Sequence, residues 1–327
     1  MMGEEKFLVT GAMGCIGAWV VRNLLRDGVE AIIFDQSDND QRLKLLLNKR
    51  ALAKVQYIQG SITNLDDIKK ALHQSGATHV IHLAALQFPF CNADPGLGAQ
   101  VNVVGTANVF EAIRSAGNQI GGMSYASSIA AYGPDHLYPQ KPLQEDVPLH
   151  PDTFYGTYKQ TNENTARVFW KEWKVGSVGL RPATIYGVAR DQGLTAGLSK
   201  ATLAAAVEQP FHISFGGPTA FQYVDDTARI FIDAARAAWK GAIVCNMHNI
   251  VTDVREFVET LQGLAPNAQI TYEKNSKLPF PVDFDCKNLR RIIPTVPLTP
   301  LTEAVGKTLD LFRKLASEGR VNSEQLE

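Results

Sequence analysis

The sequence has no excess of charge of either sign. Its 32 lysines and arginines nearly balance its 33 aspartates and glutamates, and the net charge is −1. Because nucleic acids and anionic membranes attract strongly basic surfaces, this balance favours neither as a partner. The chain also has no apolar run near the roughly 18 residues that a membrane-spanning helix requires. We therefore expect a protein that binds neither nucleic acid nor a membrane.

Cysteine is scarce, and its spacing does not match a disulfide framework or a metal site. Four cysteines are scattered along the chain without a CxxC pair, at Cys15, Cys91, Cys245 and Cys286. We expect four reduced thiols and no bound metal, as in a reducing compartment. Residues 1–6 carry two glutamates and a lysine instead of the basic and apolar segments of a secretion signal, so we expect a cytoplasmic protein.

Apolar strand-like runs alternate with helical patterns through much of the chain. The expected strands are Lys6–Thr10, Glu30–Asp35, Val55–Gln59, Thr78–Ala84, Gln119–Ser127, Gly176–Ile185 and Ala242–Met247. The expected helices between them include Gly14–Asp27, Gln41–Ala51, Asn64–Ser75, Pro95–Ala116 and Phe154–Trp173. Because this alternation requires parallel crossovers, it predicts an α/β fold with a Rossmann-type doubly wound parallel sheet.

Three glycines lie between the first strand and the first helix, in the sequence GAMGCIG. Gly11 permits a tight turn, Gly14 lets the backbone approach a pyrophosphate, and Gly17 lets the helix pack closely on the sheet. The start of the helix, at Cys15 and Ile16, offers free N–H groups and a partial positive charge to phosphates. This strand–turn–helix position predicts that the loop binds a dinucleotide.

Asp35 ends the second expected strand. A carboxylate at this place accepts hydrogen bonds from the adenosine ribose hydroxyls and repels a 2′-phosphate. Gln36 and Ser37 follow it, so no immediately neighbouring arginine is present to bind that phosphate. The cofactor is therefore expected to be NAD and not NADP.

The pattern changes after residue 187, where loops and shorter elements follow. We expect residues 1–186 to form an NAD-binding domain, to which residues 223–248 return. Residues 187–222 and 249–327 are expected to form a smaller C-terminal α/β substrate-binding domain. Its expected elements include a helix over Leu198–Glu208, a strand over Phe211–Phe215, and helices over Asp253–Gly263 and Leu301–Ser317.

Tyr155 and Lys159 lie four residues apart, on one face of an expected helix. A lysine ammonium near a phenol favours the phenolate and lowers the pKa of the tyrosine from its usual value of about 10. Tyr155 is then able to take a proton from a substrate hydroxyl while hydride leaves for the nicotinamide. Ser128, after the fifth strand, is placed to hydrogen-bond the same substrate oxygen.

Together these residues resemble a known family, the extended short-chain dehydrogenase/reductases, also called NAD-dependent epimerases/dehydratases. The resemblance covers about residues 6–230 and implies that Ser128, Tyr155 and Lys159 are the catalytic set. The matching segments follow in family order: GAMGCIG, Asp35, HLAA at 82–85, Asn102 in VNVVGT, ASSIAAYG at 126–133, YGTYK at 155–159, RPATIYG at 181–187 and YVDDTA at 223–228. The tail PLTPLTEAVGKTLDLF is also similar to the last helix of the family.

The resemblance also implies which residues line the cofactor. The expected cofactor-binding set is Gly11, Gly14, Cys15, Ile16, Gly17, Asp35, Ser61, Ile62, Leu83, Ala84, Ala85, Gln87, Asn102, Ser127, Tyr155, Lys159, Pro182, Ala183 and Thr184. Ser61 stands where family members often have an aspartate that contacts adenine, so that contact is expected to be altered. Candidate substrate residues are Gln87, Ser128, Thr184, Thr195, Gln222 and Tyr223. Family members pair through two helices, so we expect a homodimer through the helices around 101–116 and 157–173.

Two departures from the family pattern narrow the reaction. Dehydratases carry an Asp-Glu pair directly after the catalytic serine, and decarboxylases need a glutamate there, where this chain has Ile129 and Ala130. Neither reaction is therefore expected. Nucleotide-sugar enzymes commonly carry an arginine that binds the diphosphate where this chain has Thr219 and Ala220, and residues 274–277 lack a second one. A diphosphate without a bidentate arginine loses much of its binding energy.

We therefore expect an NAD-dependent oxidoreductase that oxidises a hydroxyl of a small carbohydrate-like substrate, such as a free sugar, a sugar acid or a hydroxy acid. Arg190, Lys200 and Lys277 are candidates to meet a carboxylate, although each is more often an exposed surface charge. The alternative is an NAD-dependent nucleotide-sugar 4-epimerase, similar to UDP-glucose 4-epimerase, that keeps its NAD bound. A non-catalytic NAD-binding protein is a third possibility, which the intact catalytic set disfavours.

Overall fold

The computed structural model describes residues 5–247 and 250–326. Its centre is a seven-stranded parallel sheet with the strand order β10-β6-β5-β4-β1-β2-β3. The strands are β1 (Lys6–Thr10), β2 (Glu30–Asp35), β3 (Gln56–Gln59), β4 (His79–His82), β5 (Gly122–Ala126), β6 (Ser177–Arg181) and β10 (Ala242–Asn246). The expected Rossmann-type sheet is thereby confirmed, because the chain winds outward from β1 in both directions.

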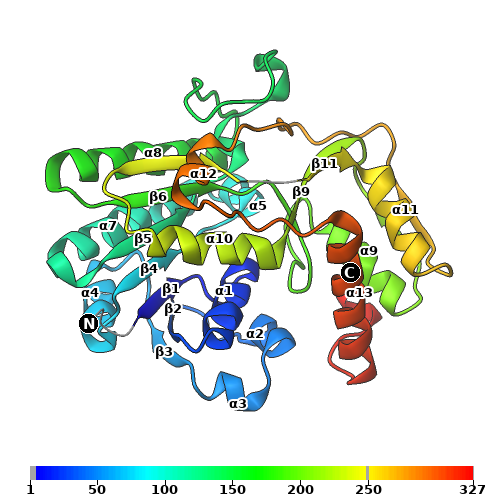
Figure 1. The fold of residues 1–327 in the computed structure, drawn as a ribbon, viewed down its shortest axis with the longest axis horizontal. Coiled ribbons are helices and arrows are strands. Elements are labelled where there is room, and N and C mark those ends of the chain that lie inside the picture. Colours follow the sequence, from blue (N-terminus) through cyan, green and yellow to red (C-terminus); the bar gives the residue numbers. More distant parts are fainter. Residues whose placement is uncertain (1–4, 248–249, 327) are drawn as a thin grey trace.

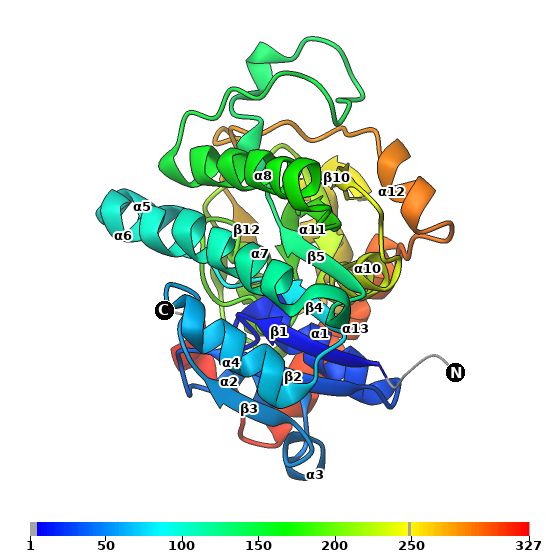
Figure 2. The same ribbon diagram turned by 90° about the vertical axis from the view of Figure 1, so that its left-hand side faces the viewer.

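Helices cover both faces of this sheet because both faces are apolar. On β1, Phe7 and Val9 join the core that contains helices α1 (Cys15–Arg26) and α10 (Val224–Arg236). Leu8 points the other way, into the core beneath α4 (Leu65–Ser75), α7 (Gly105–Ala116) and α8 (Phe154–Trp173). Figure 2 shows these last three helices lying side by side along one face of the sheet.

A second group of elements lies beside the sheet, at the right of Figure 1. It contains a three-stranded sheet with the order β11-β9-β7 and a two-stranded sheet of β12 and β8. The strands are β7 (Thr184–Tyr186), β8 (Phe211–Ile213), β9 (Pro218–Tyr223), β11 (Ile250–Asp253) and β12 (Ile270–Tyr272). Helix α13 (Leu301–Ser317) packs against α9 (Gly197–Ala206) and α11 (Val254–Leu264). The remaining helices are α2 (Gln41–Leu46), α3 (Lys49–Leu52), α5 (Phe88–Ala93), α6 (Pro95–Ala99) and α12 (Lys287–Ile292), with short turns between them.

Three expected elements are interrupted. The strand expected over Gly176–Ile185 divides at Pro182, which has no N–H for a ladder, and the part after it joins the smaller sheet. The helix expected over Gln41–Ala51 breaks at Leu47, which is extended, and Asn48 then caps α3 by accepting a hydrogen bond from Ala51. Between α6 and α7 the helix widens into a π-turn, η1 (Gln100–Val104).

All four cysteines are free thiols. Within residues 5–247 and 250–326, no helix is long and apolar enough to cross a membrane. In the same part of the chain, no three histidine, cysteine, aspartate or glutamate side chains gather as a set that could hold a metal ion.

Candidate active site

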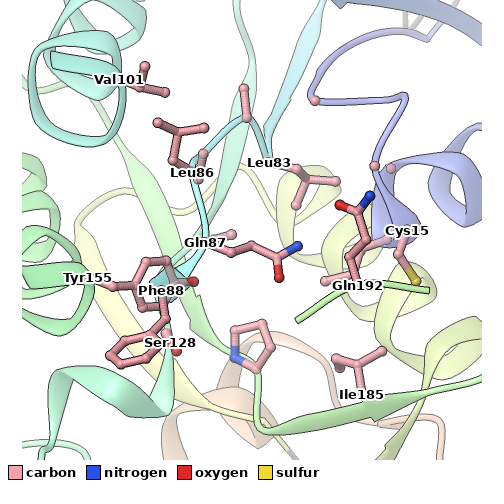
Figure 3. Close-up of a pocket in the computed structure, with 18 of the residues that line it drawn as sticks. Cys15, Leu83, Leu86, Gln87, Phe88, Val101, Ser128, Tyr155, Ile185 and Gln192 are labelled. Carbon is pink, nitrogen blue, oxygen red and sulfur yellow. The ribbon is translucent and has the colours of Figure 1, made fainter. Parts of the chain in front are cut away.

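A cavity of about 620 Å³ opens along the carboxyl ends of the central strands (Figure 3). Gly11 follows β1, Asp35 ends β2, Leu83 follows β4 and Ser127 follows β5, and all four line the cavity. In open parallel sheets this edge is where ligands bind. The volume lies within the range of about 300–1,000 Å³ that is usual for small-molecule sites.

The glycine loop is packed too closely to accept side chains. A Cβ atom on Gly11, whose φ is +71°, would lie 2.5 Å from the backbone nitrogen of Ala84. A Cβ atom on Gly17 would lie 2.4 Å from the carbonyl oxygen of Gly11. The backbone of β1 and the start of α1 therefore face the cavity without side chains between them. This cradle fits a pyrophosphate, with the free N–H groups of α1 pointing toward it.

Asp35 is held in place at the other end of this loop. Its carboxylate accepts hydrogen bonds from the backbone N–H groups of Met13 (3.2 Å) and Ser37 (3.1 Å). Arg42, in α2, also lines this part of the cavity, which the sequence analysis did not foresee. Its guanidinium donates to the carbonyl oxygen of Met13 (3.0 Å) and pairs with Asp191 (2.9 Å). Both contacts engage the Arg42 guanidinium, and the Asp35 carboxylate beside it is the group that would repel a 2′-phosphate.

Lys159, Tyr155 and Ser128 converge on the cavity. Thr153 caps α8 by accepting a hydrogen bond from the N–H of Gly156 (3.0 Å). A Cβ atom on Gly156 would lie 2.3 Å from the carbonyl oxygen of Ala130, so this glycine lets α8 begin against the turn that carries Ser128. The Lys159 ammonium donates to the carbonyl oxygen of Ala126 (2.8 Å) and lies 5.4 Å from the centroid of the Tyr155 ring.

Burial controls the acid–base properties of this group. It raises the pKa of Tyr155 to about 12, against the opposing effects of a hydrogen bond with Ser128 and the charge of Arg190. It lowers the pKa of Lys159 to about 8. The expected lowering of the Tyr155 pKa by Lys159 is not found: desolvation of the phenol dominates, and the opposing charge is that of Arg190. With this pKa the Tyr155 phenol is protonated at neutral pH. Additional positive charge beside it would favour the phenolate and lower the pKa.

A buried ion pair lies behind the catalytic group. Arg181 donates two hydrogen bonds to the Glu163 carboxylate, at 2.8 and 2.7 Å. The Ser127 hydroxyl donates to the same carboxylate (2.5 Å), and Arg181 also donates to the Tyr132 hydroxyl (2.6 Å). This network fixes the end of β5, which precedes Ser128. Sequence analysis missed it, although Glu163 lies four residues after Lys159 on the same helix face.

Four of the expected site residues do not line the cavity. Asn102 is buried and holds a loop by accepting from Leu86 N–H (2.8 Å) and donating to Leu86 carbonyl oxygen (3.0 Å). Thr184 is buried in β7, and the Gln222 amide oxygen accepts from the backbone N–H of Ala183 (2.8 Å). The Tyr223 ring packs against Trp19, with ring centroids 6.0 Å apart. These residues lie behind the cavity lining and do not form part of it.

The other expected residues all line it: Gly11, Gly14, Cys15, Ile16, Gly17, Asp35, Ser61, Ile62, Leu83, Ala84, Ala85, Gln87, Ser127, Ser128, Tyr155, Lys159, Pro182, Ala183 and Thr195. Figure 3 shows Ser128 and Tyr155 on one side, Cys15 and Gln192 on the opposite side, and the Gln87 amide pointing into the space between them. Residues 187–196, between β7 and α9, which we call the bridging segment, also contribute to the lining. Arg190, Asp191, Gln192 and Leu194 of this segment all line the cavity.

A parallel sheet that brings a tyrosine–lysine pair, a glycine loop and an aspartate at the end of β2 to one cavity is typical of an extended short-chain dehydrogenase or epimerase. A family model described as the NAD dependent epimerase/dehydratase family matches residues 7–245. The chain therefore belongs to this family, and its cofactor is NAD.

Individual relatives include both epimerases and dehydrogenases. The UDP-glucose 4-epimerase of Mycolicibacterium smegmatis is 28% identical over 321 residues, which cover 94% of this chain and 98% of that protein. The crystal structure of UDP-glucose 4-epimerase with UDP-glucose from Thermotoga maritima has a TM-score of 0.80 and 23% identity, covering 95% of this chain and 99% of that one. A partial-consensus L-threonine 3-dehydrogenase has a TM-score of 0.82 and 20% identity, covering 94% and 99%. The two structural likenesses establish a shared fold.

Proposed function

We propose that this protein moves hydride between NAD and a secondary hydroxyl of a carbohydrate, with Tyr155 as the acid/base. The observation that carries the proposal is that Ser128 and Tyr155 lie on one side of the cavity, opposite Cys15 of the glycine loop (Figure 3). Lys159 also lines the cavity, with its ammonium 5.4 Å from the centroid of the Tyr155 ring. When bound, NAD supplies the hydride acceptor. Ser128 holds the substrate oxygen, Tyr155 takes its proton, and the nearby Lys159 ammonium stabilises the phenolate that results.

The comparisons favour 4-epimerisation of a nucleotide sugar over the free-sugar dehydrogenase that the sequence analysis expected. The M. smegmatis relative, similar over nearly its whole length, carries the name UDP-glucose 4-epimerase. An epimerase returns the hydride to the opposite face of the same sugar, so it must retain its reduced cofactor between the two steps. The Arg42–Asp191 pair supports retention, because Arg42 also donates to the Met13 carbonyl oxygen and so connects the bridging segment to the glycine loop. We take the 4-epimerase as the first candidate.

A second candidate is a dehydrogenase that releases NADH after oxidising a small sugar. It is favoured by the lack of arginine at the two positions where nucleotide-sugar enzymes usually bind the diphosphate. Thr219 and Ala220 lie within β9 and are 0% and 1% exposed, so neither is able to contact a substrate. Lys277 does not line the cavity and packs beside Gly217.

Incubation with NAD and matched substrates separates these candidates. Conversion of UDP-glucose to UDP-galactose without accumulation of NADH supports the epimerase. Stoichiometric NADH with free sugars, and none with UDP-sugars, supports the dehydrogenase. If neither class of substrate reacts while NAD binds, the proposed hydride transfer is wrong and a non-catalytic role remains.

The domain division and the assembly state are proposed on structural support. β10 pairs with β6 in the large sheet, which supports the return of residues 223–248 to an NAD-binding domain formed by 1–186; residues 1–4, 248–249 and 327 lie outside the described part. A homodimer through α7 and α8 is supported by Val168 and Trp173, which are 49% and 51% exposed on α8. Sedimentation velocity at micromolar concentration tests the dimer, and a monomer would contradict it. The cytoplasmic location and the absence of a nucleic-acid partner stay predictions.

A further inference from the structure

Arg190 places a positive charge at the cavity. Its side chain lines the cavity, and it makes no ion pair within residues 5–247 and 250–326. The Nε atom is buried and has no hydrogen-bond partner there. The Nη2 atom donates to the Thr195 hydroxyl, at 3.3 Å. Arg190 as a whole is half-buried, but a buried N–H donor without an acceptor is costly, so this arrangement is suited to an anion that arrives with a ligand.

The backbone of the bridging segment is shaped to hold Arg190 in this place. Ala189, directly before it, has φ of +73°, a left-handed conformation that costs about 1 kcal/mol or more in a residue other than glycine. A Cβ atom on Gly193 would lie 2.4 Å from Gln87 Oε1 and 3.0 Å from Arg190 Nη2, so this glycine lets both side chains approach. Strain and close approach of this kind are typical of functional sites.

The neighbouring charges leave Arg190 available. Asp191, the adjacent carboxylate, is engaged by Arg42. Of the three cations that the sequence singled out, Lys200 donates to the carbonyl oxygen of Leu326, Lys277 lies outside the cavity, and Arg190 alone lines it. Nothing in the sequence favoured one of the three, and only their positions in the fold identify Arg190 as the one at the cavity.

Two anions are able to reach this guanidinium: a group on the substrate and the pyrophosphate of the cofactor. Arg190 lines the same cavity as Tyr155 and Cys15, and its charge opposes the burial that raises the pKa of both, so it is within electrostatic range of the catalytic end and of the glycine loop. The pyrophosphate already has the backbone N–H groups of the loop and the start of α1. Arg190 instead has Thr195 in contact and Gln87 close by, which add neutral polar groups suited to sugar hydroxyls.

We propose that Arg190 binds a carboxylate of the substrate, and that the protein therefore acts on sugar acids, either free or linked to a nucleotide. A guanidinium group matches a planar carboxylate with two parallel hydrogen bonds, which a neutral hydroxymethyl group is unable to replace. This inference rests on the proposed hydride transfer at Tyr155 and applies equally to an epimerase and a dehydrogenase. Gln87 and Thr195 complete the recognition group.

The test uses the NAD-loaded protein and two matched pairs of probes: D-glucuronate with D-glucose, and UDP-glucuronate with UDP-glucose. Binding is measured by calorimetry and turnover by steady-state kinetics, for the wild type, Arg190→Met and Arg190→Lys. Lys277→Met is the matched control, because it removes a charge outside the cavity. NAD affinity of each variant is measured separately.

We expect the acid of one pair to bind about 10- to 100-fold more tightly than its neutral partner. Arg190→Met should remove that preference by raising KM more than it lowers kcat, Arg190→Lys should restore part of it, and Lys277→Met should leave it unchanged. A preference for D-glucuronate over D-glucose would identify a free sugar acid as the substrate. A preference for UDP-glucuronate over UDP-glucose would identify a nucleotide-linked one.

Equal binding of acid and neutral probes by the wild type in both pairs would overturn the inference. So would an Arg190→Met variant whose only loss is NAD affinity, because the guanidinium would then serve the pyrophosphate. Failure of the proposed function looks different: acids are bound selectively, yet no probe is oxidised or epimerised.

Discussion

Arg42 and Asp191 lie 149 residues apart in the sequence and meet at the cofactor cavity. The Arg42 Nε donates to both carboxylate oxygens of Asp191, at 3.0 and 3.1 Å. A further hydrogen bond joins Arg42 to the carbonyl oxygen of Met13 in the glycine loop. The bridging segment is also held by the Trp19 indole, which donates to the Val188 carbonyl oxygen (2.9 Å). Two contacts thus tie this segment to the part of the fold that holds NAD.

Removing the Arg42–Asp191 pair should speed release of NAD. Both side chains are partly exposed, so the pair is worth no more than about 1 kcal/mol, or about fivefold in dissociation rate. Arg42→Gln, Asp191→Asn and the double variant should each release NAD faster in stopped-flow displacement, with less than additive effects. Glu111→Gln, which breaks a surface pair with Arg114 on α7, is the control. Dissociation rates equal to the wild type in all three variants would show that the pair does not retain the cofactor.

Asp35 should set the preference for NAD over NADP. Its carboxylate is oriented by the N–H groups of Met13 and Ser37 toward the place of the ribose hydroxyls. Asp35→Asn removes the repulsion of a 2′-phosphate and weakens acceptance from the hydroxyls, so NAD affinity should fall about tenfold while NADP affinity rises. Fluorescence titration with both cofactors measures this. An unchanged ratio of the two dissociation constants would exclude Asp35 from the ribose site.

Replacing Lys159 with methionine should abolish turnover and stabilise the fold. Burial lowers the pKa of Lys159 from 10.5 to about 8, so folding disfavours its charged form. This penalty is about 3 kcal/mol at pH 7, and part of it is offset by the hydrogen bond to Ala126, so the expected gain is on the order of 1–3 kcal/mol.

The pH dependence of that gain tests its origin. Between pH 8 and 10.5 the unfolded chain binds more protons at Lys159 than the folded one, so wild-type stability rises with pH across this window. The advantage of Lys159→Met should therefore be largest at and below pH 8 and fade toward pH 10.5. Urea unfolding at several pH values measures it. A constant advantage across the window would mean that the charge of Lys159 is not the cause.

Breaking the buried Glu163–Arg181 pair should be costly. Both side chains are nearly inaccessible, at 7% and 3% exposure, so the partner that remains becomes an uncompensated buried charge. Arg181→Met should lower the free energy of unfolding by about 3–5 kcal/mol. The variant Arg181→Met with Glu163→Leu should recover much of that loss in the same unfolding assay. If the single variant is as stable as the wild type, the pair does not hold the end of β5.

The elements that the sequence predicted best are those with a strong local signal. The strands at Lys6–Thr10 and Glu30–Asp35 and the helix at Phe154–Trp173 have the expected bounds, because apolar runs and a cap mark their ends. The helix expected at Gln41–Ala51 breaks where an extended Leu47 precedes a local asparagine cap. The spacing of apolar residues over Gln41–Ala51 fits one continuous helix and did not reveal that break.

The candidate site divides in the same way. Residues in the glycine loop and the catalytic helix were found because chemistry restricts their spacing. Gln222 and Tyr223 were expected to meet a substrate, but the Gln222 amide bonds the Ala183 backbone and the Tyr223 ring packs against Trp19, and neither contact between distant segments is marked by a local pattern. Arg42 and Asp191 depend on contact between distant segments, and no local pattern marks either of them.

The most direct test of the account is a single-turnover experiment on Tyr155. Wild type and Tyr155→Phe are loaded with NAD, mixed with the substrate identified by the probe panel, and followed for formation of bound NADH. The account predicts that the variant binds NAD as the wild type does, within about twofold, and forms NADH at least about 100-fold more slowly, since only the proton acceptor is lost. NADH formation at the wild-type rate in Tyr155→Phe would contradict it.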